Sequence, residues 1–404
     1  MRTYPTVDDA SGRTIGAAEI AAVTRVLETG RLWRVGGTEA DALEREFAEL
    51  IGSGYAVASG SGSSAVHLAV AAVDPEPGDE FVVPPLTDFG SVLGVLSNNA
   101  VPVFAEVDPL TGCLTPQSVE ACLTDRTRAV IVVHLFGGPA DVEGIKAVCA
   151  PRGVVVIEDC AQAYLTVPPG GSTYAGTRGL IGCFSLQQSK HITAGEGGLT
   201  VTDDPELARR MRLFADKGWP RDTGQRDHLM LGLNYRMSEV AAAIGRVQLT
   251  KLPDVVRRRT EVAAALSERL RDLPGLVLPR PEGHSYFLYP LVLDVETTGF
   301  TNREYVAQLA GTGAPVGAGY LQRPVYRTTV LTEKRTYGTS GYPLHAPPAA
   351  TEPDYASVRC EVTEDLIARR LVIALINEGF GDADVDALGD ALTDAYKHAA
   401  DQVA

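Results

Sequence analysis

The sequence predicts an α/β fold in which a mostly parallel central sheet is flanked by helices, with a smaller α+β domain at the C-terminal end. Three observations support this prediction. Between residues 55 and 202, short β-branched runs alternate with stretches that carry apolar residues at helical spacing. The runs are apolar at nearly every position, as strands are when both faces of a sheet are covered. With 404 residues, 45% of them hydrophobic, the chain is long enough for one large core and a second, smaller one.

Five strands of the larger domain are expected where apolar, β-branched residues run together. They are the segments 56–58, 81–83, 101–104, 129–133 and 153–157. The segments between them, such as 63–73 and 141–150, are long enough to cross from one parallel strand to the next as helices. Helices are therefore expected on both faces of this sheet.

The pattern changes after residue 234. We expect a buried Ala-rich helix over 238–252, an amphipathic linker helix over 254–273, a strand over 286–293, helices over 302–309 and 363–376, and loops over most of 311–353. A boundary between residues 250 and 251 gives a large domain of residues 1–250 and a small C-terminal domain of residues 251–404.

The charge of the chain argues against nucleic acid and membrane surfaces as partners. With 51 acidic and 36 basic side chains, the formal net charge is -15, which provides no basic field for phosphate backbones or anionic lipid. No run reaches the ~20 apolar residues of a membrane span and the first residues lack a secretion signal, so a cytoplasmic protein is expected. The six scattered cysteines show no metal-binding spacing, so we expect reduced thiols and no metal site.

The first chemical motif is the turn Ser59-Gly60-Ser61-Gly62-Ser63-Ser64, between an expected strand and an expected helix. A helix N-terminus presents free N–H groups and the positive end of its dipole, which suits a phosphate group. The serine hydroxyls add further donors. The same pattern also fits a flexible loop with a serine cap.

The second motif is Asp159, which follows the buried strand 153–157 after a single glutamate. Ligands of parallel sheets bind outside the carboxyl ends of the strands, so Asp159 is expected at such a site. A carboxylate there can keep the pyridine nitrogen of pyridoxal 5′-phosphate (PLP) protonated. A helix cap and a Mg²⁺ ligand are alternative roles for an aspartate in this position.

The third motif is the segment from Phe184 to Gly198, in which an apolar strand ends in polar residues and a single lysine, Lys190. A lysine that acts as an amine needs burial or a nearby positive group to lower its pKa. A closed, glycine-lined turn between two strands can provide this environment. Most lysines are solvated surface residues, but Lys190 follows Ser185 and precedes Gly-Glu-Gly-Gly, which favours a chemical role.

The order of these three motifs is that of fold-type I PLP enzymes, and together they resemble the DegT/DnrJ/StrS family of sugar aminotransferases. The resemblance covers about residues 15–388. It is carried by the phosphate turn with 65–69, by 156–162, by 184–198, and by Asn234-Tyr235-Arg236-Met237. It implies a PLP cofactor and an amino-transfer reaction.

The resemblance also implies roles for single residues. Lys190 corresponds to the lysine that forms a Schiff base with PLP, and Asp159 to the partner of the pyridine nitrogen. Gln162 corresponds to a residue that contacts the ring hydroxyl of the cofactor. The expected phosphate ligands are Ser63, Ser64 and Ser185.

Two further implications concern the rest of the site. Asn234 corresponds to a residue that reaches the phosphate of the neighbouring subunit, which implies a homodimer with shared active sites. The segment 320–327 loosely resembles the family's C-terminal active-site loop. From it, Tyr320, Tyr326 and Arg327 are expected to bind substrate.

The chain departs from the family pattern after residue 85. There the family has a threonine and then an aromatic residue that stacks on the pyridine ring, whereas this chain has Thr87-Asp88-Phe89-Gly90. A carboxylate cannot replace the ring contact of an aromatic side chain. Because Gly90 permits unusual backbone geometry, we expect a local shift that lets Phe89 cover the ring and leaves Asp88 to contact the substrate. Plain helix-start packing is the alternative role of Phe89.

The run Leu186-Gln187-Gln188-Ser189 before Lys190 resembles the branch of the family that acts on keto-cyclitols and aminoglycoside precursors. This favours a keto-cyclitol or keto-sugar acceptor, with glutamine or glutamate as donor, in secondary-metabolite (antibiotic) biosynthesis. A nucleotide-linked keto-sugar is the alternative acceptor. A dehydratase on this scaffold would have histidine in place of Lys190, and a non-catalytic PLP-binding regulatory protein is a third possibility.

Overall fold

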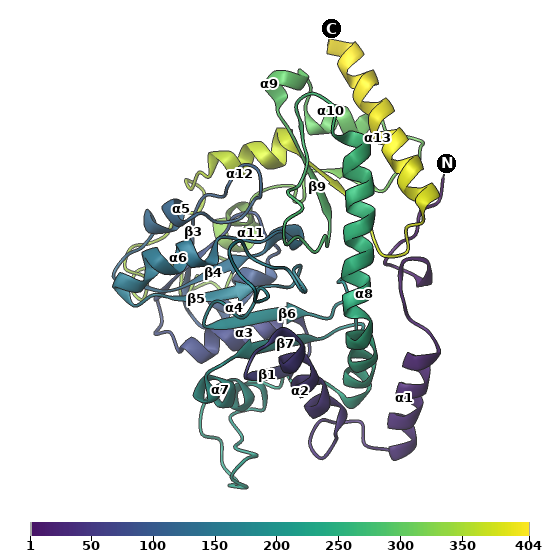
Figure 1. Cartoon of the computed structure of the whole chain (residues 1–404). Coiled ribbons are helices and arrows are strands. Elements are labelled where there is room, and N and C mark those ends of the chain that lie inside the picture. The colour runs from purple at the N-terminus through teal and green to yellow at the C-terminus, as the bar shows by residue number, and fades with distance from the viewer. Residues whose placement is uncertain (1, 404) are drawn as a thin grey trace.

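The computed structural model describes residues 2–403 and includes a seven-stranded sheet in the order β1-β7-β6-β5-β4-β2-β3 (Figure 1). Strands β6, β5, β4, β2 and β3 are parallel to their neighbours in this series, whereas β7 runs antiparallel to both β6 and β1. The predicted α/β class with a mostly parallel sheet is confirmed. The strands are β1 (Tyr55–Ser59), β2 (Glu80–Val83), β3 (Val101–Phe104), β4 (Thr127–Val133), β5 (Val155–Asp159), β6 (Ile181–Ser185) and β7 (Gly198–Thr202).

Helices cover both faces of this sheet. Along β2, Phe81 and Val83 belong to the apolar core on one face, and Val82 belongs to the core on the opposite face. This alternation explains why the strand is apolar at every position. The helices on the first face are α3 (Gly62–Val73), α4 (Gly90–Ser97) and α7 (Pro205–Ala215), and those on the second face include α2 (Glu39–Ile51), α5 (Pro116–Glu120) and α6 (Val142–Cys149).

Helix α8 (Glu239–Leu270) is one continuous helix of 32 residues, where the sequence predicted two (Figure 1). Pro253 lies inside it, between the two predicted helices, and removes one backbone donor. The helix continues because residues on both sides of Pro253 are buried: Leu252 in the core beside β1 and Val262 in the core of the second sheet. Tertiary packing therefore outweighs the local cost of the proline.

The second sheet is antiparallel, with four strands in the order β10-β11-β9-β8. The strand predicted over 286–293 and the helix predicted over 302–309 occur as β9 and α10. The helix predicted over 363–376 occurs only as far as residue 370, as α12 and a π-helical turn (Leu366–Arg370), because Leu-Val-Ile-Ala at 371–374 pairs with β9 and β10 as a buried strand. The elements are β8 (Leu276–Val277), β9 (Tyr289–Leu293), α9 (Val295–Thr298), α10 (Asn302–Ala307), β10 (Val316–Ala318), α11 (Thr329–Thr332), α12 (Glu361–Asp365), β11 (Leu371–Ala374) and α13 (Asp382–Val403).

The N-terminal segment contacts the second sheet's core before the chain reaches α1 (Ala17–Thr29). Tyr4 stacks on Phe380 with ring centroids 5.8 Å apart. The domain boundary between residues 250 and 251 remains a prediction, and it falls within α8. Among the helices of residues 2–403, none combines the length and the apolar character needed to cross a membrane.

Candidate active site

A cavity of about 920 Å³ lies at the carboxyl ends of the central strands, and the last residues of β4, β5 and β6 line it. This is the edge where ligands of parallel sheets bind. Seven of the residues predicted from the sequence line the cavity together. They are Ser63, Asp88, Asp159, Gln162, Ser185, Lys190 and Tyr320.

Lys190 lies in the turn that follows β6, and its side chain faces the cavity. Burial lowers the pKa of its amine, while the negative charges of Asp159 and Asp88 oppose this shift. The Nζ atom lies 4.4 Å from the ring centroid of Phe287, which covers it on one side. The amine is therefore in the kind of partly desolvated environment that a nucleophilic lysine requires.

Asp159 is the last residue of β5 and is buried. Its Oδ2 accepts a hydrogen bond from Ser91 Oγ at 2.7 Å, and its Oδ1 accepts one from the N–H of Ala161 at 3.0 Å. Burial raises the pKa of the carboxyl group, whereas these two hydrogen bonds favour its ionised form. Each oxygen keeps a further lone pair, so the carboxylate can accept a hydrogen bond from a cationic group in the cavity.

The N-terminus of α3 forms one end of the cavity. Ser61 caps the helix by accepting a hydrogen bond from the N–H of Ser64 at 3.1 Å. A Cβ atom on Gly62 would lie 2.6 Å from Cβ of Ser185, so only glycine lets Ser185 pack against this first turn. The free N–H groups of the turn, with the hydroxyls of Ser63 and Ser185, form a cradle of the right character for a phosphate.

Ser64, predicted as a phosphate ligand, has a different contact in the structure. Its hydroxyl donates to the carbonyl oxygen of Ser61 at 2.7 Å, and its side chain does not line the cavity. As the third residue of α3, it completes the capping box instead.

Gln162 links the two parts of the chain that enclose the cavity. Its Oε1 accepts a hydrogen bond from the N–H of Phe136 at 2.7 Å, and its Nε2 donates to the hydroxyl of Tyr320 at 2.9 Å. Burial raises the pKa of Tyr320 to about 12, so this side chain remains a neutral phenol. The hydrogen bond from Gln162 therefore holds Tyr320 at the cavity wall.

The structure places Asp88, and not Phe89, on the cavity wall. Phe89, which was expected to shift onto the cofactor ring, does not line the cavity in this structure. The N–H of Gly90 donates to Asp88 Oδ1 at 2.7 Å, and this turn starts α4 so that Phe89 packs against the core beneath it. This arrangement favours the simple register, with the carboxylate of Asp88 at the position where the family pattern has an aromatic ring.

We expect Phe89→Ala to leave PLP affinity unchanged and to lower the free energy of unfolding by about 2 kcal/mol, less than a fully buried phenylalanine would cost. The reason is that Phe89 packs in the core and does not line the cavity. Fluorescence titration with PLP and denaturant unfolding measure the two effects. A five- to tenfold loss of PLP affinity, the value of about 1 kcal/mol of ring stacking, would instead support the shifted register.

Three other predicted residues do not reach this cavity within the chain. Tyr326 is buried and donates to Glu364 at 2.6 Å, and Arg327 pairs with the same carboxylate at 3.2 Å. Asn234 is exposed and forms an isolated backbone bridge with Asp216. The loose match of 320–327 thus identified Tyr320 correctly as a cavity residue, but Tyr326 and Arg327 stabilise the loop itself.

Sequence reasoning missed a group of cavity residues that come from distant segments. They include residues 3–8 of the N-terminal segment, Phe287 before β9, Arg259 in α8 and Asn377 after β11. The N-terminal segment is tied down by hydrogen bonds from Asn377 to the carbonyl oxygen of Pro5 and from Gln188 to that of Val7, each of 2.8 Å. These residues carry no motif, and only the aromatic run before β9 offered a signal.

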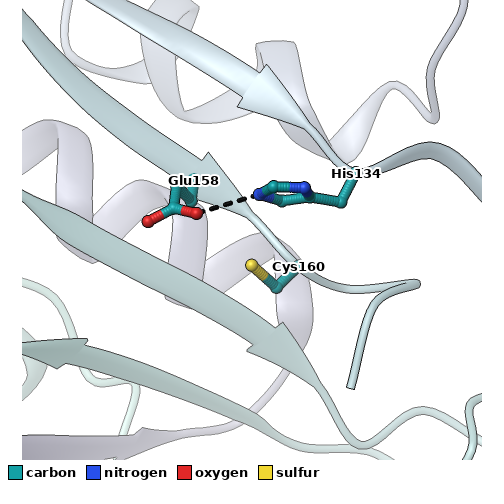
Figure 2. Close-up of side chains that lie close together, drawn as sticks. All are labelled: His134, Glu158 and Cys160. Carbon is teal, nitrogen blue, oxygen red and sulfur yellow. Dashed lines mark hydrogen bonds and ion pairs between the residues drawn. The ribbon is translucent and has the colours of Figure 1, made fainter. Parts of the chain in front are cut away.

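Next to Asp159 lies a buried cluster of His134, Glu158 and Cys160 that has the composition of a metal site (Figure 2). Its histidine and its carboxylate already form hydrogen bonds with other groups of the protein. His134 Nε2 lies 2.9 Å from Glu158 Oε2, and its Nδ1 accepts the N–H of Ala140 at 3.1 Å. Glu158 also accepts the N–H groups of Gly176 at 2.9 Å and Arg178 at 2.8 Å. The contacts hold the loops on either side of β5, so we assign the cluster a structural role.

The cavity residues fit PLP. The α3 turn with Ser63 and Ser185 suits the phosphate, and the buried carboxylate of Asp159 suits a protonated pyridine nitrogen. Lys190 lines the same cavity, and the charge of Asp159 acts on its amine. Fold and site together define the class as a fold-type I PLP-dependent enzyme.

Comparisons with known proteins narrow this class to one family. Residues 13–393 match the model of the DegT/DnrJ/EryC1/StrS aminotransferase family. The chain belongs to this family and is a PLP-dependent aminotransferase.

Solved structures agree with this assignment. An aminotransferase from Psychrobacter cryohalolentis is 28% identical, with a TM-score of 0.83 over 95% of this chain and 98% of that chain. The 3-amino-5-hydroxybenzoic acid synthase is 30% identical, with a TM-score of 0.82 over 95% and 97%. The aminotransferase TlmJ from Streptoalloteichus hindustanus is 29% identical, with a TM-score of 0.81 over 95% and 97%.

Proposed function

We propose that this aminotransferase moves an amino group from glutamine or glutamate to a keto-cyclitol or keto-sugar, in the cytoplasm and as a step of secondary-metabolite biosynthesis. The observation that carries the proposal is the desolvated amine of Lys190 beside the buried carboxylate of Asp159, at the carboxyl end of the sheet. When bound, PLP supplies an electron sink for the carbon that loses its proton.

In this proposal each residue has a defined task. Lys190 holds the cofactor covalently and, once displaced by the donor's amino group, serves as the general base that moves the proton at the donor's α-carbon. Asp159 keeps the pyridine nitrogen protonated, and Gln162, held by Phe136 N–H and Tyr320, contacts the ring hydroxyl. Ser63 and Ser185 hold the phosphate.

The polar groups that remain on the cavity wall support a polyhydroxylated acceptor. One oxygen of Asp88 accepts from Gly90, which leaves the other free to accept hydrogen bonds from a sugar or cyclitol hydroxyl. Tyr320 is a neutral phenol on the same wall. The run 186–189 before Lys190 favours a free cyclitol or aminosugar over a nucleotide-linked sugar.

One experiment separates the candidate functions. The purified protein is loaded with PLP, converted to the amine form with glutamine or glutamate, and mixed with keto-cyclitols or with nucleotide-linked keto-sugars. We expect keto-cyclitols to restore the original visible spectrum. Restoration by nucleotide-linked sugars alone would support the alternative acceptor, loss of water without amine formation would indicate a dehydratase, and failure to react with any donor would indicate a regulatory PLP-binding protein.

The homodimer with shared active sites is part of this proposal. Asn234 is exposed and does not line the cavity of its own chain, and the exposed Leu229, Leu231 and Leu233 precede it. Leu231 retains 88% of its full exposure, and such apolar patches usually contact a partner.

Mixing Lys190→Ala protomers with Asn234→Ala protomers should restore part of the activity, because a hybrid dimer has one site with both residues intact. Subunit exchange is checked by mass spectrometry of the native dimer and activity by the half-reaction. Hybrids that form but remain inactive would argue against shared sites.

A further inference from the structure

Behind the turn that carries Lys190 lies a buried cluster of Arg13, Glu378 and Arg259. Arg259 Nε lies 2.8 Å from Glu378 Oε2, and Arg13 Nη1 lies 3.8 Å from Glu378 Oε1. The side chains of both arginines are 1% exposed and that of Glu378 is 4% exposed. The three residues come from the N-terminal segment, from α8 and from the loop after β11, so the cluster joins parts of the chain that are distant in sequence.

The two arginines hold the main chain on either side of the Lys190 amine. Arg13 donates to the carbonyl oxygen of Lys190 at 2.6 Å and also to that of Gln188. Arg259 donates to the carbonyl oxygen of Phe287 at 3.0 Å. Glu378 is the shared anion that lies between the two arginines.

A second contact joins the same two segments. His191 Nε2 lies 2.9 Å from the carbonyl oxygen of Ser285. The lysine turn and the segment 285–287 are therefore tied together twice, and the ring of Phe287 lies 4.4 Å from Lys190 Nζ as a result.

The energetics of the cluster favour a positioning role over a stabilising one. A buried ion cluster loses the hydration of three charges, and apolar residues of similar size often stabilise a protein as well or better. Arg259 Nη2 and Glu378 Oε1 are buried without hydrogen-bond partners, so the cluster is not fully compensated. Its hydrogen bonds do, however, fix two main-chain segments relative to each other.

We propose that Glu378 is a positioning residue for Lys190: through Arg13 and Arg259 it keeps the ring of Phe287 over the lysine amine. The inference rests on the proposed function only in the role of Lys190 as the cofactor-bearing amine. Water is excluded from one side of this amine by Phe287. Two carboxylates also act on this amine: Asp159 at the end of β5 and Asp88 just before α4. Their negative charges favour the protonated amine, and both residues remain unchanged in every variant below.

The test is the titration of the Lys190 amine in the full-length protein after removal of PLP. Trace labelling with an amine-specific acylating reagent at a series of pH values, followed by peptide mass spectrometry, gives the midpoint for each lysine. In the wild type the midpoint should lie below the ordinary value of a lysine amine. Glu378→Asp keeps the charge but shortens the reach, so the midpoint should rise, with a several-fold smaller fraction of neutral amine at neutral pH.

Phe287→Ala, Phe287→Leu and the double variant of Glu378→Asp with Phe287→Ala test the route through Phe287. Phe287→Ala should raise the midpoint as well, and the double variant should exceed the larger single effect by little, because both changes remove the same cover. Phe287→Leu should keep most of the shift. If Glu378→Asp does not fold, Arg259→Lys, which keeps the charge but loses the fork that reaches Phe287, is expected to give the same result.

Glu106→Asp is the matched control, since Glu106 accepts the N–H groups of Val362 at 2.8 Å and Thr363 at 3.1 Å far from the lysine turn. It should leave the Lys190 midpoint unchanged. A wild-type midpoint in Glu378→Asp, or fully additive effects in the double variant, would overturn the proposal. The measurement needs no substrate, so loss of the donor half-reaction in the wild type would count against the proposed function alone.

Discussion

Replacing Lys190 with alanine is expected to abolish amino transfer while leaving the fold intact. Loss of the general base alone lowers a rate by about 10²–10⁴-fold, and loss of the covalent link to PLP adds to this effect. The fold should tolerate the change because burial disfavours the charged amine, which alanine removes. Single-turnover kinetics of the donor half-reaction and denaturant unfolding measure the two outcomes.

The assignment of Lys190 is checked directly by borohydride reduction of the PLP-loaded protein followed by peptide mapping. The wild-type protein should be yellow and should carry the label on Lys190. Lys146→Ala, a change of a partly exposed lysine paired with Glu143, is the control and should leave colour and rate unchanged. A label on any other lysine would show that the assignment is wrong.

The parts of the fold that were predicted correctly are those in which local pattern and tertiary environment agree. The strand 81–83 is apolar at every residue because both faces of the sheet are covered, and this signal needs no further information. For residues 371–374 the local pattern alone led to a wrong prediction. Their apolar run also fits a helix, and only pairing with β9 and β10 makes it a strand. At Pro253 the sequence predicted two separate helices, but packing on both sides keeps α8 continuous.

The same distinction applies to the site. Asp159, Ser185 and Lys190 stand at strand ends or in the turn that follows, where their residue types and order carry a chemical signal. Phe287 and Glu378 act through contacts between segments about 100 or more residues apart in the chain, and the sequence does not indicate such contacts. Phe89 shows that a motif with one unusual residue predicts position better than it predicts orientation, because the Asp88–Gly90 hydrogen bond decides which side chain faces the cavity.

Asp159→Asn is expected to lower the rate of the donor half-reaction by about 10²–10³-fold, the usual cost of removing a preorganised electrostatic group from an active site. An amide is nearly isosteric: its oxygen can still accept the N–H of Ala161, and its NH2 group can donate to Ser91 Oγ if the Ser91 hydroxyl turns to donate to Thr87, so the geometry of the strand end should be kept. It carries no negative charge, however, and no longer favours a protonated pyridine nitrogen. The rate constant and the visible spectrum of the bound cofactor, followed by stopped-flow absorbance, measure this change.

Measuring the free energy of unfolding of Asp159→Asn distinguishes a loss of catalysis from a folding defect. Because burial raises the pKa of Asp159 in the folded state, an ionised carboxylate there costs stability as pH rises above the ordinary carboxyl range. Without PLP, Asp159→Asn should therefore be at least as stable as the wild type at neutral pH, and its stability should depend less on pH. Ser91→Ala, which removes one hydrogen bond to the carboxylate, is the graded control, with an expected loss of about tenfold in rate. If Asp159→Asn kept the wild-type rate, the pyridine nitrogen would have no need of this carboxylate, and the assignment of Asp159 would be wrong.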